Sequence, residues 1–132
     1  MAINFIIGRK LGMTRIFDNQ GFDFPVTIVE AGPCAVTQIK SVEKEGYSAV
    51  QIGFLDKSER RLNMSEKGHY KKAGISGRRF MKEFRYKNVG DVELGQEFTT
   101  SIFEIGDIVS VTAVSKGRGF AGHMKRHNFS GG

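Results

Sequence analysis

The chain has 132 residues, of which 39% are hydrophobic, and this is enough to bury one core, so we expect residues 1–132 to form a single domain. The longest apolar run near its start, residues 5–7, is too short for a signal peptide or a membrane span. Cys34 has no second cysteine to pair with, which favours a reducing compartment. We therefore expect a cytoplasmic protein with no membrane partner. Its formal net charge of +6 favours a polyanion as its binding partner.

The basic residues are concentrated in two segments. Residues 57–87 carry eleven Lys and Arg against three acids, and residues 115–132 carry four basic residues and no acid. Residues 88–114 hold five acids and no Lys or Arg. Charge that only kept the protein in solution would be mixed along the chain. This distribution predicts binding of a polyanion, through basic extensions at residues 57–87 and 115–132 that are disordered alone and fold on their partner.

The first half predicts short antiparallel strands joined by turns. Apolar and polar residues alternate there, and residues that favour turns gather between the alternating stretches. Cys34 begins one of these stretches, so we interpret it as a strand residue and not as a nucleophile, which would need a nearby histidine. The predicted strands cover residues 13–17, 22–30, 34–42 and 47–55.

The second half predicts one short helix and two further strands. Residues 65–73 suit a helix with Ser65 as its N-cap. Residues 105–114 are rich in β-branched side chains and predict a strand. Many short strands with frequent turns favour a small antiparallel barrel, mainly β, with one or two short helices.

Residues 78–87 predict a strand with two different faces. Phe80, Lys82, Phe84 and Tyr86 alternate with a second set that is mostly basic. We interpret the aromatic face as part of the core. The alternative is that these rings stack on unpaired RNA bases.

Residues 117–122 match the pattern G-x-G-x-x-G. As a dinucleotide loop the pattern would need a crossover helix, another strand and an acidic ribose ligand, for which too few residues follow. We favour a phosphate contact, because glycines let backbone N–H groups approach a phosphate while Lys116 and Arg118 supply charge. A nucleotide-binding enzyme that uses this loop remains an alternative, although no acid–base pair or nucleophile motif predicts catalysis.

His123 and His127 are spaced to share one face of a helix, as two metal ligands would be. No third ligand follows at a suitable spacing, and Lys125 and Arg126 would repel a cation. We therefore predict no metal site and no other cofactor, and interpret both histidines as neighbours of phosphates or bases.

Five blocks of the sequence together resemble the bacterial-type ribosomal protein L-three family of the large subunit. The blocks occur in the family's order from residue 7 onward, and the last is the most specific. They are residues 7–14 (IGRKLGMT), 30–33 (EAGP), 46–54 (GYSAVQIGF), 68–74 (GHYKKAG), and 115–122 (SKGRGFAG) with 125–127 (KRH).

The resemblance implies a Greek-key barrel of the translation-protein type, with long basic extensions that thread into ribosomal RNA. It implies a structural constituent that binds large-subunit ribosomal RNA beside other ribosomal proteins, takes no small-molecule substrate and has no catalytic residues. It also implies a role in subunit assembly and in the architecture around the peptidyl transferase centre. The alternative within RNA binding is a basic module that is not ribosomal.

The predicted RNA contacts fall into two groups. Those that match family blocks are Arg9, Lys10, His69, Lys71, Lys72, Lys116, Gly117, Arg118, Gly119, His123, Lys125, Arg126 and His127. Those that rest on charge and position alone are Arg60, Arg61, Arg78, Arg79 and Arg85.

The sequence departs from the family's pattern in its length. Family members continue into a loop that approaches the catalytic centre and then into strands that close the barrel, whereas this chain stops at Gly132. Either the chain is shortened or its barrel is completed differently. A shortened chain is expected to leave an open sheet edge.

Overall fold

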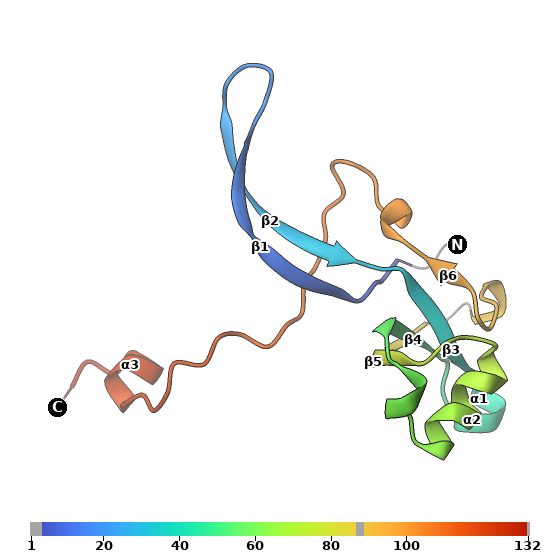
Figure 1. The fold of residues 1–132 in the computed structure, drawn as a ribbon. Coiled ribbons are helices and arrows are strands. Elements are labelled where there is room, and N and C mark those ends of the chain that lie inside the picture. Colours follow the sequence, from blue (N-terminus) through green and yellow to red (C-terminus); the bar gives the residue numbers. More distant parts are fainter. Residues whose placement is uncertain (1–3, 87–88, 132) are drawn as a thin grey trace.

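The computed structural model describes residues 4–86 and 89–131, and it begins with a long hairpin that projects from a four-stranded sheet (Figure 1). β1 (Gly8–Phe17) and β2 (Asp23–Ala31) pair antiparallel along their length. The turn between them is closed by Asp18, whose carboxylate accepts hydrogen bonds from two backbone N–H groups. The hairpin predicted around residues 18–21 is confirmed.

The four-stranded sheet has the order β5-β4-β3-β6, and all neighbouring strands are antiparallel. At the passage from the hairpin into this sheet, Gly32 has a φ of +72° and lies so close to the chain that an added Cβ would be 3.1 Å from the carbonyl oxygen of Phe98. Only glycine fits this bend without strain. The strands are β3 (Cys34–Lys40), β4 (Ala49–Asp56), β5 (Arg78–Arg85) and β6 (Glu97–Phe98).

Short helical turns connect these strands. α1 (Val42–Glu45) joins β3 to β4, and η1 (Glu59–Arg61) and α2 (Met64–Ala73) join β4 to β5. The helix predicted over residues 65–73 is confirmed, but its N-cap is Asn63 and not Ser65, because Asn63 and Glu66 form a reciprocal capping box. The turns η2 (Val89–Asp91) and η3 (Thr100–Ile102) flank β6.

The core lies on one face of the sheet. Val36, Val50, Ile52 and Phe54 are at most 1% exposed, as the two-residue period of β3 and β4 predicts. This face is covered by residues 5–7 and by apolar side chains of η2 and η3. Fully burying each such side chain contributes roughly 1.5–3 kcal/mol.

The basic segment at residues 57–87 differs from the expected irregular extension. It forms η1, α2 and β5, and β5 pairs with β4 over most of its length. The strand expected over residues 78–87 is present as β5, although Lys87 lies outside the described residues. The segment is ordered because β5 carries enough apolar side chains to pair and pack with the sheet, and α2 buries Tyr70 and Ala73.

The strand predicted over residues 105–114 is wrong. This stretch has neither helix nor strand, and Ile105, Ile108 and Val114 are fully exposed. β-Branched residues favour strands only where a partner completes the hydrogen-bond ladder. In the part of the chain that the structure describes, no strand pairs with this segment.

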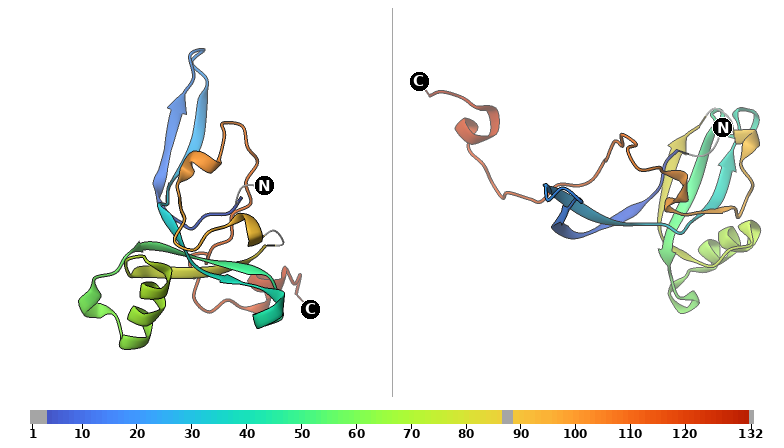
Figure 2. Two further views of the ribbon diagram at one scale, coloured as in Figure 1. Left: turned by 90° about the vertical axis from the view of Figure 1, so that its right-hand side faces the viewer. Right: turned by 90° about the horizontal axis from the view of Figure 1, so that it is seen from above.

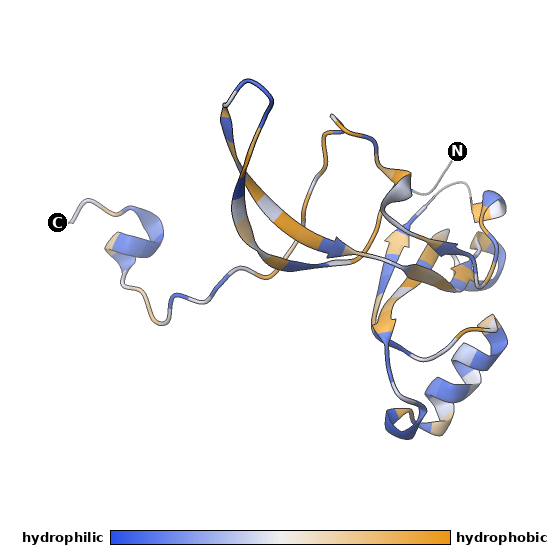
Figure 3. Ribbon diagram, turned by 45° about the horizontal axis from the view of Figure 1, so that its top comes forward, coloured by the Kyte–Doolittle hydropathy of each residue, from blue (hydrophilic) through white to orange (hydrophobic). Residues whose placement is uncertain are grey.

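The predicted class, mainly β with antiparallel strands and few short helices, is confirmed. The sheet is open, since β5 and β6 are its two edges in the described residues, and it fits a small barrel-like domain. Beyond β6 the chain runs out to α3 (His123–His127), far from the sheet (Figures 1 and 2). Figure 3 shows hydrophobic residues along β4 and the hairpin, whereas α2 and α3 are mostly hydrophilic.

Candidate nucleic-acid interface

The connection between β4 and β5 presents a group of exposed cations, which we call the basic lobe. In the described part of the chain, none of its members forms an ion pair. Cations that no acid neutralises produce a positive surface potential suited to a polyanion. The basic lobe consists of Arg60, Arg61, Lys67, Lys71 and Lys72, all exposed on η1 and α2.

The acid within α2 does not weaken this potential much. The Glu66 carboxylate lies 2.9 Å from the Lys57 ammonium and accepts a hydrogen bond from the backbone N–H of Asn63. The hydrogen bond from Lys57, followed by that from Asn63, lowers the pKa of Glu66. Glu66 and Lys57 therefore neutralise each other at the start of α2, while the lysines within the helix are exposed.

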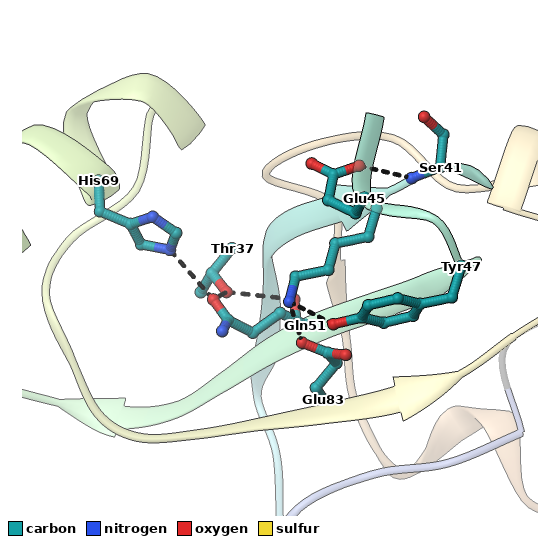
Figure 4. Close-up of polar contacts among 8 residues, drawn as sticks. Thr37, Ser41, Glu45, Tyr47, Gln51, His69 and Glu83 are labelled. Carbon is teal, nitrogen blue, oxygen red and sulfur yellow. Dashed lines mark hydrogen bonds and ion pairs between the residues drawn. The ribbon is translucent and has the colours of Figure 1, made fainter. Parts of the chain in front are cut away.

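His69 attaches α2 to the sheet. Its Nε2 donates to the Gln51 Oε1 at 3.1 Å, and the Thr37 hydroxyl donates to the same oxygen at 2.7 Å (Figure 4). His69 is half-buried, so this bond sets the rotation of α2 over β3 and β4. Lys71 and Lys72, two and three residues further along the helix, remain exposed.

A second network removes two charges from the surface. The Lys40 ammonium contacts the Glu83 carboxylate and donates to the Tyr47 hydroxyl at 2.7 Å (Figure 4). The hydrogen bond with Glu83 raises the pKa of Lys40, and the same bond lowers the pKa of Glu83. Glu83 is the acid among the cations of β5, and this pairing compensates its charge.

Two adjacent arginines of β5 have opposite environments. Arg78 is 7% exposed, and its guanidinium donates to Asp56 at 2.9 Å and to Glu97 at 2.7 Å. Arg79 is exposed and forms no ion pair among the described residues. Arg85, also exposed, lies over the Tyr47 ring at 4.5 Å. Arg78 therefore stabilises the fold, whereas Arg79 and Arg85 are exposed on its surface.

The basic residues of the hairpin are largely compensated. Arg9 forms a salt bridge of 2.8 Å with Glu30, and Arg15 forms one of 3.1 Å with Asp23. Lys10 is exposed and has no ion pair within the described chain. Of the two predicted contacts on the hairpin, only Lys10 thus has an uncompensated charge.

The remaining predicted contacts lie in the C-terminal tail. They are exposed on a segment that runs far from the basic lobe (Figure 1). His123 and His127 share one face of α3, with ring centroids 6.2 Å apart, and the described residues contain no group of three or more potential metal ligands. The tail contacts are Lys116, Gly117, Arg118, Gly119, His123, Lys125, Arg126 and His127.

The surroundings of residues 117–122 differ from those of a dinucleotide-binding loop. The glycine pattern at residues 117–122 follows an irregular segment instead of a strand, and the helix after it has five residues. Cys34 is confirmed as a strand residue, and its thiol is fully buried. Burial raises the pKa of that thiol, which suppresses the thiolate that a nucleophile needs.

The structure brings some predicted contacts together and separates others. The basic lobe and the outward arginines of β5 belong to one folded unit, whereas the hairpin and the tail carry theirs at separate places. Sequence reasoning did not single out the exposed Lys67 and Lys82, although the charge of segment 57–87 included both. No helix in the described part of the chain is long and apolar enough to cross a membrane.

The chain resembles curated proteins named large ribosomal subunit protein uL3. It is 51% identical to that of Syntrophomonas wolfei over 127 residues, 53% to that of Picosynechococcus sp. over 128 residues, and 50% to that of Brachyspira hyodysenteriae over 127 residues. Each alignment covers 96% of this chain but only 58–60% of the relative. No family model matches the chain. The resemblance predicted from the sequence blocks is nevertheless confirmed: over nearly its whole length, this chain is similar to the uL3 family of large ribosomal subunit proteins.

Proposed function

We propose that this chain is a structural constituent of the large ribosomal subunit that binds large-subunit ribosomal RNA and performs no catalysis. The observation that carries the proposal is the basic lobe, in which five exposed cations lack ion pairs in the described chain. Of the three acids in segment 57–87, Glu66 and Glu83 are each paired with a lysine, and Glu59 in η1 is exposed. The similarity to uL3 supports the ribosome as its location in the cytoplasm.

The mechanism is electrostatic capture followed by fitting to the RNA surface. Lysine and arginine neutralise phosphates and release the counterions condensed on the RNA. The basic lobe and β5 present their cations on folded elements, so little backbone ordering opposes binding there. The tail consists of exposed residues that bury little in the described structure, and we propose that it adopts its final path on the RNA.

We further propose that the chain has neighbouring ribosomal proteins, contributes to subunit assembly and supports the architecture around the peptidyl transferase centre. The resemblance of the 115–127 block to its family supports this role. The hairpin also suits a protein neighbour better than RNA, because its apolar side chains are exposed while two of its arginines are paired with acids.

A salt series tests the RNA proposal. If about ten basic residues contact phosphate, the slope of log affinity against log salt will be roughly −7 to −9 for large-subunit RNA. The double variant Lys71→Gln, Lys72→Gln should lower the magnitude of this slope by roughly 1.4–1.8. Arg15→Gln is the matched control, because Arg15 is an exposed cation that is already paired with Asp23. Equal affinity of the chain for random RNA of the same length would contradict the ribosomal assignment.

A further inference from the structure

The aromatic residues of β5 and its end divide between two environments. Phe84 stacks on Phe5 with ring centroids 4.3 Å apart, and Tyr86 meets the same ring edge-on at 5.9 Å. Both pack against the core. Phe80 is different, because 48% of its surface is exposed. The interpretation of these rings as core residues therefore applies to Phe84 and Tyr86, and Phe80 needs another explanation.

The strand register places Phe80 beside the core. In the register of the sheet it lies directly opposite Phe54, a core residue that is 1% exposed. Residues opposite each other on antiparallel strands have Cβ atoms about 4.5–5.5 Å apart. Phe80 therefore lies on the same face of the sheet as Phe54, and a ring with two side-chain torsions loses little entropy on binding a ligand.

Two cations of β5 lie close to Phe80 in the sequence, one before it and one after it. The Arg79 guanidinium lies over the Phe80 ring, 5.3 Å from its centroid. Lys82 follows two residues later on the same strand face and is exposed. Within the residues that the structure describes, neither Arg79 nor Lys82 forms an ion pair. Among the residues that the structure describes, β5 is also an edge strand, and a ligand can approach it there from the side that β4 does not occupy.

We infer that Phe80, Arg79 and Lys82 form a stacking site for one unpaired RNA base. The Phe80 ring and the Arg79 guanidinium that lies over it supply the planar surfaces for stacking, and Lys82 supplies the charge for the adjoining phosphate. The inference rests on the proposed binding of RNA and specifies the form of RNA that this strand takes, an unstacked nucleotide in a loop or bulge and not a regular duplex.

The charges favour RNA over a protein partner at this position. An apolar protein surface would have to remove water from two unpaired cations, which is unfavourable without acids to receive them. A nucleotide supplies an aromatic face and a negative phosphate together. The three side chains match both halves of that ligand.

The test compares two single-stranded RNA decamers, one of uridine and one of dihydrouridine. They carry the same phosphates, but the dihydrouracil ring is not planar and stacks poorly. Wild-type protein should bind the uridine decamer more tightly, by about fivefold or more if stacking of one base is lost. Phe80→Leu keeps an apolar side chain over Phe54 without an aromatic face, and it should reduce this preference to near unity. Phe80→Trp should retain or increase it.

Matched measurements separate failure of this inference from failure of the proposed function. Phe17→Leu is the control, because Phe17 is 69% exposed on the hairpin, outside the predicted RNA contacts, and its replacement should leave the preference unchanged. Thermal unfolding verifies that each variant is folded. An unchanged preference in Phe80→Leu overturns the stacking site even if both decamers bind with a steep salt dependence. If the wild-type protein binds no RNA at all, the proposed function itself is overturned.

Discussion

Replacement of Arg78 and Arg79, one at a time, separates the fold from the RNA surface. The two residues are adjacent and both are predicted RNA contacts from the sequence. In the structure Arg78 is 7% exposed and bridges Asp56 and Glu97, whereas Arg79 is exposed. We expect Arg78→Ala to lower stability and leave the salt dependence of RNA binding unchanged. Arg79→Ala should leave stability nearly unchanged and weaken the salt dependence of RNA binding.

The magnitudes follow from the surroundings of each residue. Hydrogen bonds to charged groups contribute roughly 1.5–3 kcal/mol each, but Asp56 and Glu97 are 75% and 55% exposed and regain water when Arg78 is removed. The stem of Arg78 also packs against Gly53, where an added Cβ would lie 2.6 Å from the Arg78 Cγ. We therefore expect Arg78→Ala to lower the free energy of unfolding by about 2–4 kcal/mol. Arg79→Ala should change it by less than about 1 kcal/mol.

Urea denaturation measures the first effect, and a salt series with single-stranded RNA measures the second. Loss of one phosphate contact in Arg79→Ala should reduce the magnitude of the log–log slope by about 0.7. Arg78→Met keeps the aliphatic stem without the charge, so it should lie between wild type and Arg78→Ala in stability and match wild type in slope. The reasoning is refuted if Arg78→Ala keeps wild-type stability and reduces the slope.

Three further predictions concern other positions. Gly68→Ala should raise the free energy of unfolding by about 0.5–1 kcal/mol, because Gly68 lies inside α2 and an added Cβ would meet nothing within 4 Å; lower stability in urea denaturation would contradict this. The lowered pKa of Glu66 means that its contribution to stability is present above its ordinary value of 4.5 and is lost as the pH falls through the lower value in the folded protein. Denaturation curves of Glu66→Gln should therefore depend less on acid pH than those of wild type, and identical curves would count against the ion pair with Lys57. The Cys34 thiol, fully buried and with a raised pKa, should react with iodoacetamide only after urea unfolds the chain, so rapid labelling of the native protein would be inconsistent with the fold.

Local sequence patterns predicted the elements whose partners are near in the chain. The turn residues at 18–21 join two strands that pair with each other, and β3 and β4 are likewise joined by a short connection. The alternation of Val50, Ile52 and Phe54 placed these residues in the core because a strand's period is independent of its neighbours. Each of these features depends on residues close together in the sequence.

The errors came from features that depend on distant partners. Residues 105–114 have strand composition but no ladder partner in the described structure. The same limitation applies to the candidate site, since charge alone could not distinguish Arg78 from Arg79. That distinction requires the positions of Asp56 and Glu97, which lie 22 and 19 residues away in the sequence. Phe80 could not be separated from Phe84 either, because the segment that covers Phe84 comes from the N-terminus.

Co-sedimentation with the large ribosomal subunit through a high-salt wash tests the central claim most directly. Salt weakens peripheral electrostatic binding steeply, whereas a protein that is fitted into folded RNA also keeps contacts that salt does not screen. We predict that the chain remains with the large subunit after the wash and is absent from the small-subunit fraction. Complete release into the wash, or equal recovery with both subunits, would contradict the assignment.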